Sequence, residues 1–308
     1  MMKKFLFVFT IFIIINVWAD FVYAPFDSSM VMTSQSADQN INILYSFLKE
    51  QYEKRNPSIT KCNQNSIPKI IHQIWIGPRP IPDKYKKLTE SWKQKFPDWQ
   101  YKLWTNNEVE EFKFKEKDLF NLASSYQEKS DILRYAILRE YGGLYVDMDY
   151  EAINNFGAIL SKYDFIGSIE PTHANNIAIS NAIIASKPKN TLFEEVFKVI
   201  RKNWHSVEKS LIHEVGKSRL QENLIHLAVN RTMTPLKQSS IDYLKIIKCA
   251  IILPPTYLSI ESRDKFFDKL KNFFGIKSKR LYFRTIQPET LARQLRGGKR
   301  QVDNLRDF

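Results

Sequence analysis

The chain has 308 residues, of which 44% are hydrophobic and 13% aromatic, and its formal net charge is +13. This length and composition can bury one large core, and 9 glycines with 13 prolines exclude a collagen-like or low-complexity chain. The positive charge favours a phosphorylated ligand or an acidic membrane surface as partner, although a lysine-rich surface that maintains solubility explains it equally well. Nucleic acid is not expected as a partner, because the sequence contains no motif of that class.

The first 24 residues have the pattern of a targeting segment. Lys3 and Lys4 precede an apolar run over residues 5–19 that ends at Asp20. This run is shorter than the roughly 20 apolar residues of a typical membrane span, so a cleaved signal peptide and a retained signal-anchor both fit. We therefore expect a protein that is membrane-associated through a single N-terminal span, or secreted after cleavage.

Residues 25–65 are predicted to form a linker followed by an amphipathic helix. Small polar side chains dominate residues 25–40, whereas apolar residues recur at helical spacing between Ile41 and Tyr52. The chain has two cysteines, Cys62 and Cys249, which are too few for a zinc site or a disulfide framework. They can form one bridge if the mature protein is extracytoplasmic.

Strand and helix patterns alternate from residue 67 onward. Strands are predicted over 70–76, 99–104, 144–148, 165–169 and 182–185, and helices over 83–96, 131–141 and 193–204. Ser130 is predicted as the N-cap of the 131–141 helix, and Gly142-Gly143 as its C-terminal stop. The alternation predicts an α/β domain with a mostly parallel sheet and flanking helices, in which ligands bind beyond the carboxyl ends of the strands.

Asp147 and Asp149 are the candidate metal ligands. They stand two residues apart at the end of a predicted strand, so their carboxylates can project on one side while Met148 points into the core. Hard cations such as Mg²⁺ and Mn²⁺ take oxygen ligands, and such a cation stabilises a leaving diphosphate as a Lewis acid. An Asp-x-Asp pair alone is a weak signal, and a solvated turn is the simpler interpretation.

The helix predicted before Asp147 and Asp149 supports a functional interpretation of these two carboxylates. Asp131 and Arg134 lie on one face of the predicted helix, although a simple i, i+3 ion pair also explains their spacing. Trp75 falls at the end of the first predicted strand, where it can line the same cleft or pack as a core aromatic. His72, on that strand, is predicted to pack rather than to bind metal.

This region closely resembles the sugar-binding region of glycosyltransferase family 32, which includes fungal α-mannosyltransferases and shares its core with the large clostridial glucosylating toxins. The resemblance rests on two runs, Ser130-Asp131-Ile132-Leu133-Arg134-Tyr135 and Tyr141-Gly142-Gly143-Leu144-Tyr145-Val146-Asp147-Met148-Asp149. Residues 67–77, 97–104 and 181–186 are similar to further segments of the family in the same order, the last of them facing the acceptor. The resemblance covers residues 66–260, which are therefore expected to form the catalytic domain.

The resemblance implies a GT-A type nucleotide-sugar-binding fold with a Rossmann-like sheet. It implies that Trp75 stacks on the nucleotide base, and that Asp131 and Arg134 hold the sugar and the ribose or phosphate. Asp147 is then expected to contact donor hydroxyls and the metal, and Asp149 to bind the metal directly. The implied reaction is the metal-dependent transfer of a hexose from GDP-mannose or a UDP-hexose, with retention, to a glycan, lipid or protein, using Mn²⁺ or Mg²⁺.

The resemblance is incomplete toward the C-terminus. Relatives carry a His or Ser-Trp element there that completes the metal site, whereas residues 284–291 contain neither His nor Trp. The alternative is therefore a catalytically degenerate GT-A scaffold that acts as a nucleotide- or glycan-binding protein or at a membrane surface. Residues 261–308 are predicted as a basic extension, whose interleaved Lys, Arg and Phe suit either an anionic membrane or a solvated tail.

Overall fold

The structure is a computed structural model that describes residues 25–30, 39–55, 67–123, 125–169, 179–214, 249–254, 257–261 and 291–295. The predicted signal segment 1–24 and most of the predicted basic extension lie outside these residues. Within the described ranges, the structure contains no helix with the length and apolar character needed to cross a membrane.

A six-stranded sheet forms the centre of the molecule, in the order β2-β1-β3-β6-β5-β7. Its strands are β1 (Ile70–Ile74), β2 (Gln100–Trp104), β3 (Gly143–Val146), β5 (Phe165–Ser168), β6 (Ile183–Ser186) and β7 (Ala250–Leu253). Strand β1 is parallel to β2 and β3, and β5 is parallel to β7, whereas β6 runs antiparallel to both of its neighbours. The predicted α/β class with a mostly parallel sheet is therefore confirmed.

A second sheet has three strands in the order β4-β9-β8. They are β4 (Tyr150–Ala152), β8 (Leu258–Glu261) and β9 (Ala292–Leu295), with β9 antiparallel to β4 and parallel to β8. Strand β9 comes from the segment predicted as a basic extension, and it pairs with the strand that directly follows Asp149. The C-terminal segment thus contributes a strand beside the acidic motif.

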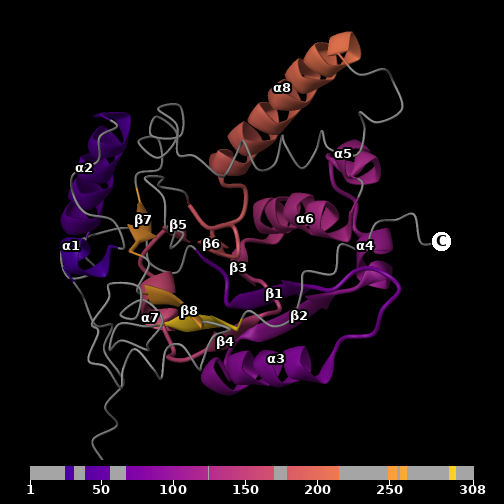
Figure 1. The fold of residues 1–308 in the computed structure, drawn as a ribbon. Helices are drawn as coiled ribbons and strands as arrows, with labels where there is room; N and C mark the ends of the chain where they lie inside the picture. Colours follow the sequence, from indigo (N-terminus) through magenta and orange to yellow (C-terminus); the bar gives the residue numbers. More distant parts are fainter. Residues whose placement is uncertain are drawn as a thin grey trace, which may run out of the picture.

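The helices cover both faces of the central sheet. They are α1 (Phe26–Ser29), α2 (Gln39–Lys54), α3 (Asp83–Lys95), α4 (Asn106–Glu111), α5 (Lys117–Leu122), α6 (Tyr126–Tyr141), α7 (Gly157–Leu160) and α8 (Thr191–Glu214). Helices α3 and α6 lie on opposite sides of β1 and β2, and α2 lies beside β7 (Figure 1). Helix α3 is fixed to β4 because Trp92 Nε1 donates to the Tyr150 carbonyl at 2.9 Å, and Ser91 Oγ accepts from the Ala152 amide at 2.9 Å.

Helix α6 is deeply buried and begins earlier than predicted. Every residue from 132 to 138 is at most 4% exposed. The N-cap is Ser125, not Ser130, because Ser125 Oγ accepts from the Glu128 amide while the Glu128 carboxylate accepts from the Ser125 amide, both at 3.2 Å. This reciprocal pair is a capping box. The Ser130 hydroxyl instead donates to the Tyr126 carbonyl at 2.9 Å, inside the helix.

Gly142 and Gly143 make the sharp turn from α6 into β3. Their φ angles are 64° and 95°, and a Cβ atom would lie 2.6 Å from the Pro188 nitrogen at Gly142 and 2.6 Å from the Ile70 carbonyl oxygen at Gly143. Only glycine tolerates this backbone at such close approach. The predicted glycine stop is therefore confirmed, and it places β3 directly against β1.

His72 packs at this junction, as predicted. Its side chain is 0% exposed, its Nδ1 accepts from Trp104 Nε1 at 3.1 Å, and its Nε2 lies 2.9 Å from the Gly142 carbonyl oxygen. Because a carbonyl only accepts, Nε2 carries the proton and the ring is neutral. Burial lowers the pKa of His72 to about 4, which is consistent with a neutral structural side chain.

The residues before β1 pack against the domain. Phe26 is 1% exposed, and its ring lies 5.4 Å from Tyr45 and 5.6 Å from Tyr52 between centroids. The stretch expected as a linker therefore contains α1 and a buried anchor, and the helix expected over residues 41–52 is α2. Cys249 is disulfide-bonded, and the other cysteine in the sequence, Cys62, lies outside the described residues.

Candidate functional site

Asp147, Met148 and Asp149 form the turn between β3 and β4. The Tyr150 amide donates to the Asp147 carbonyl at 3.2 Å, and the Asp147 amide donates to the Ala182 carbonyl at 2.8 Å. Met148 is buried, while both aspartates are half-buried. The turn therefore presents two carboxylates at the carboxyl end of β3, and the predicted inward direction of Met148 is confirmed.

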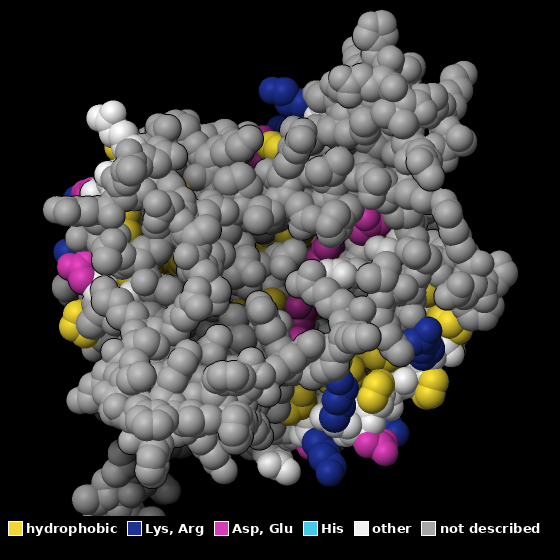
Figure 2. Space-filling model, in the orientation of Figure 1, with side chains coloured by type: hydrophobic (Ala, Val, Ile, Leu, Met, Phe, Trp, Pro, Cys, Tyr) yellow, Lys and Arg dark blue, Asp and Glu magenta, His cyan; other side chains and the backbone are white. Residues whose placement is uncertain are grey.

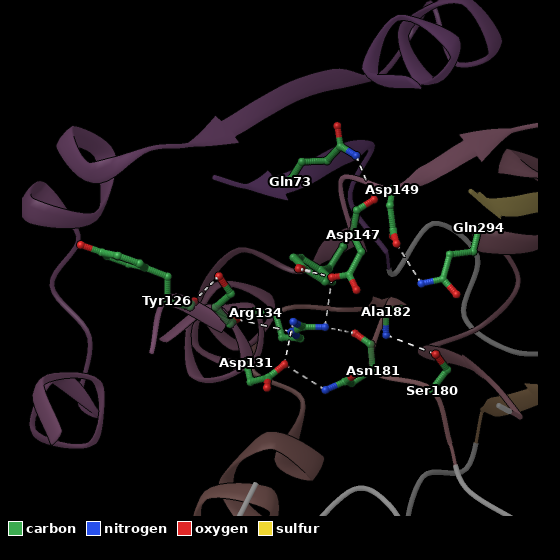
Figure 3. A network of polar contacts seen from close by, with 12 residues as sticks. Gln73, Tyr126, Asp131, Arg134, Asp147, Asp149, Ser180, Asn181, Ala182 and Gln294 are labelled. Carbon is green, nitrogen blue, oxygen red and sulfur yellow. Dashed lines mark hydrogen bonds and ion pairs between the residues drawn. The ribbon is translucent and has the colours of Figure 1, made fainter. Parts of the chain in front are cut away.

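Arg134 connects helix α6 to this turn (Figure 3). Its Nη2 lies 2.7 Å from Asp131 Oδ1, and its Nη1 lies 3.2 Å from Asp147 Oδ1. The same Nη1 donates to the Asn181 carbonyl at 2.6 Å, and the Arg134 side chain is only 5% exposed. The planar guanidinium can reach all three acceptors at once. The structure thus brings together three of the residues singled out from the sequence: Asp131, Arg134 and Asp147.

Burial and charge act in opposite directions on Arg134. Burial disfavours its charged form, but the neighbouring Asp147, Tyr145 and Asp131 hold the pKa of Arg134 above its usual value. The Tyr145 ring lies under the guanidinium, 4.7 Å from Arg134 Cζ, and its hydroxyl donates to Asp147 Oδ1 at 2.6 Å. Burial raises the pKa of Tyr145 well above its usual value, so the hydroxyl remains a donor to Asp147.

Asn181 supports the network from the segment that leads into β6. Its backbone carbonyl binds Arg134, and its side-chain Nδ2 donates to Asp131 Oδ1 at 3.1 Å. Asp131 Oδ1 therefore receives contacts from both Arg134 and Asn181. Sequence reasoning placed residues 181–186 near the acceptor but assigned Asn181 no contact, because an isolated asparagine before a strand carries no periodic signal.

Asp149 is reached from the C-terminal strand β9. Gln294 Nε2 donates to Asp149 Oδ2 at 3.0 Å (Figure 3). The adjacent Arg293 donates through Nε to Glu151 Oε2 at 3.2 Å. The sequence offered no His or Ser-Trp element in this region, and the structure instead places a glutamine amide beside the acidic turn. A single glutamine in a basic segment gave no pattern from which this contact could be predicted.

Trp75 lies beside this network rather than within it. It follows β1 directly and is half-buried, its amide donates to the Trp104 carbonyl at 2.9 Å, and its Nε1 donates to the Arg79 carbonyl at 2.8 Å. Its ring lies 5.6 Å from the Tyr85 ring. Within the described part of the chain these contacts do not include the aspartates or Arg134. Because β1 and β3 are parallel neighbours, however, Trp75 and Asp147 follow strand ends at the same edge of the sheet.

The charges at the turn suit a divalent cation. The site contains three carboxylates, those of Asp131, Asp147 and Asp149, and one guanidinium, that of Arg134. Its formal charge is therefore −2. Acidic side chains are visible recessed near the middle of the face in Figure 2, whereas Lys and Arg lie toward its rim. No group of three or more His, Cys, Asp or Glu side chains that could hold a metal occurs among the described residues. The two carboxylates of the turn, Asp147 and Asp149, offer the hard oxygen ligands that Mg²⁺ and Mn²⁺ accept when phosphate and water complete the shell.

In open α/β sheets ligands bind beyond the carboxyl ends of the strands, and the acidic turn after β3 lies at such a strand end. Residues 82–166 match the family described as glycosyltransferase sugar-binding region containing DXD motif. This match confirms, over these residues, the resemblance inferred from the sequence.

Two fungal proteins are similar to a little under half of the chain. A mannosyl phosphorylinositol ceramide synthase of Saccharomyces cerevisiae is 31% identical over 157 residues, which are 49% of this chain and 40% of that protein. Inositol phosphoceramide mannosyltransferase 1 of Schizosaccharomyces pombe is 33% identical over 147 residues, which are 45% of this chain and 44% of that protein. The chain thus spans less than half the length of these two relatives.

The similarity to solved structures is distant. The PaToxG glycosyltransferase aligns with a TM-score of 0.39 at 22% identity, over 68% of this chain and 85% of that one. The catalytic domain of alpha-toxin from Clostridium novyi aligns with a TM-score of 0.41 at 12% identity, over 62% of this chain and 73% of that one.

Proposed function

We propose that the protein is a metal-dependent glycosyltransferase that moves a hexose from a nucleotide sugar to a glycan, lipid or protein acceptor. The observation that carries this proposal is the buried Arg134 network, which fixes Asp131 and Asp147 beside Asp149 at the carboxyl end of the sheet. The match over residues 82–166 supports it. The names of the fungal relatives make GDP-mannose the first donor to test, followed by UDP-hexoses.

The exposure of the side chains suggests how the donor is held. Asp131 and Asp147, whose side chains are 14% and 30% exposed, would accept hydrogen bonds from donor hydroxyls. Arg134, at 5% exposed, holds both carboxylates and contributes positive charge toward the diphosphate. Trp75 offers a half-buried ring on which the nucleotide base stacks.

Asp149 and Asp147 are proposed to hold Mn²⁺ or Mg²⁺, which, when bound, stabilises the negative charge of the leaving diphosphate. Gln294 Nε2 fixes one oxygen of Asp149 and thereby orients its carboxylate. We propose transfer with retention on the front face: the acceptor oxygen bonds to the anomeric carbon as the bond to the diphosphate breaks, and its proton passes to the departing oxygen. The network that holds Asp131 and Asp147 keeps the hexose oriented during this exchange.

A lipid acceptor and a membrane location are the first to examine. The two fungal relatives are named for inositol phosphoceramide or mannosyl phosphorylinositol ceramide chemistry. The basic residues between 263 and 300 and the apolar segment at residues 5–19 would favour work at an anionic membrane. Secretion after cleavage of the first segment remains the alternative location.

The test is a donor screen with the full-length chain in detergent and Mn²⁺. Release of UDP or GDP is measured from a panel of nucleotide sugars, with and without lipid acceptors. Asp149→Asn is expected to lower kcat by about 100-fold or more, because it weakens the electrostatic stabilisation of the leaving group. The matched control is Glu90→Gln, an exposed carboxylate on α3 that pairs with Lys93, and it should retain full activity.

Two outcomes would count against the proposal. If no donor in the panel is turned over or bound in the presence of Mn²⁺, the glycosyltransferase assignment is wrong. Binding of a nucleotide by calorimetry without any turnover would favour the degenerate, ligand-binding scaffold instead.

A further inference from the structure

Gln73 is a buried polar side chain that the proposed reaction does not use directly. It lies on β1 and is 0% exposed. Its Oε1 accepts from the Thr89 hydroxyl at 3.0 Å and from the Tyr101 hydroxyl at 2.8 Å, while its Nε2 donates to the Asp147 carbonyl at 3.3 Å. One amide therefore joins α3, β2 and the acidic turn.

The partners fix the direction in which this amide faces. The Asp147 backbone carbonyl can only accept, so the amide nitrogen must face it. The amide oxygen must then accept from both hydroxyls, and burial raises the pKa of Tyr101 to about 12, so that this hydroxyl keeps its proton. If the amide were rotated by about 180°, Gln73 Oε1 would face the Asp147 carbonyl oxygen, and neither atom can donate. The hydrogen-bond partners therefore determine the orientation of the Gln73 amide.

The position of Gln73 in the sheet explains why this contact matters. Backbone pairing between β1 and β3 reaches His72 and Tyr145. The side chain of the next residue on β1, Gln73, holds the Asp147 carbonyl just beyond the end of β3, pointing toward it from the strand (Figure 3). That same carbonyl accepts from the Tyr150 amide and so closes the turn.

We propose that Gln73 is a positioning residue for the turn that carries Asp147 and Asp149. It anchors the first peptide of the turn to α3 and β2, so that both carboxylates are held before metal or donor arrives. A buried amide is costly to leave without hydrogen bonds, and small displacements of a positioning group lower rates by as much as about 100-fold. The consequence for catalysis rests on the proposed function, whereas the effect on the turn does not.

Three forms of the full-length chain test this proposal: wild type, Gln73→Met and Thr89→Val. Methionine has a similar volume but cannot hold the Asp147 carbonyl. Valine at position 89 removes one hydroxyl from Gln73 Oε1 and leaves the bond to Asp147 in place. Hydrogen–deuterium exchange is followed in peptides that cover residues 144–152, alongside Mn²⁺ binding and donor kinetics.

Gln73→Met is expected to raise exchange at residues 147–150 by about tenfold or more, to weaken Mn²⁺ binding, and to lower kcat/KM for the donor by about tenfold. Thr89→Val should change each quantity by less than about threefold. If Gln73→Met unfolds the protein, Gln73→Asn replaces it, since it keeps a polar amide but is one methylene too short to reach the Asp147 carbonyl.

Unchanged exchange at residues 147–150 in the position 73 variant would overturn the proposal, as would an equal effect of Thr89→Val. Exchange is measured without turnover. If wild type turns over no donor, the proposed function fails, while the exchange data still decide the role of Gln73.

Discussion

Replacing Arg134 with methionine tests the charge balance of the acidic site. The substitution fills similar space but removes the cation whose nitrogens lie 2.7 Å from Asp131 and 3.2 Å from Asp147. Removing one partner of a buried ion pair costs about 3–5 kcal/mol, and we take about 3 kcal/mol because the Asp147 side chain is 30% exposed. Since 1 kcal/mol corresponds to about 2–4 °C in a domain of this size, the Tm should fall by about 6–12 °C.

The assay is thermal unfolding followed by circular dichroism, with and without Mn²⁺. A second variant, Arg134→Met with Asp131→Asn, also removes one of the two carboxylates that Arg134 pairs with and should recover part of the lost Tm. Mn²⁺ should stabilise Arg134→Met more than wild type, because the remaining site is more negative. A Tm within about 2 °C of wild type, or a further loss on adding Asp131→Asn, would refute this account of the site.

Two further predictions concern His72 and Gly143, which lie where β1 and β3 pack together ahead of the acidic turn. The pKa of His72 is lowered to about 4 by burial, so the unfolded chain binds a proton that the folded protein does not, and stability should be lost as the pH falls from about 6.5 to about 4. Urea unfolding should show that the free energy of unfolding is about 2–3 kcal/mol lower at pH 4.5 than at pH 7 in wild type, and that this difference is absent in His72→Asn. An equal difference in both proteins would contradict the neutral state assigned to His72. Gly143→Ala should destabilise the protein by about 2 kcal/mol or more, because its φ is 95° and its Cβ would meet the Ile70 carbonyl oxygen at 2.6 Å. Gly157→Ala, whose nearest contact is the Asn155 side chain at 3.2 Å, is the matched control in thermal unfolding, and equal Tm values would count against the steric argument.

Strong periodic patterns allowed much of the fold to be predicted. The helix over residues 83–96 and the strands near 70–76 and 99–104 match α3, β1 and β2 closely. The strands β4, β8 and β9 could not be predicted, because each is defined by its pairing partners rather than by an apolar pattern of its own. The start of α6 was missed because Ser130 fits an N-cap in isolation, whereas the reciprocal bonds of Ser125 and Glu128 are formed one turn earlier.

The acidic site was predictable where its residues share one local pattern. Helical spacing placed Asp131 and Arg134 on one face, and the apolar strand pattern over 144–148 placed Asp147 at a strand end. The two glutamines were not found, because an amide has no period and its partners lie far away in sequence. Gln73 did carry one signal, since a polar residue within the apolar run at 70–76 has to find hydrogen-bond partners once it is buried.

The contact between Asp149 and Gln294 joins residues 145 positions apart, and this has a consequence for synthesis. A ribosome that adds about 5–20 residues per second needs roughly 7–30 s to make the intervening chain. During that interval Asp131, Arg134, Asp147 and Asn181 have all been made and can assemble near the tunnel exit, while the strand that holds Asp149 does not yet exist. The order of synthesis therefore allows the contacts from helix α6 to form before the contact from the distant strand β9.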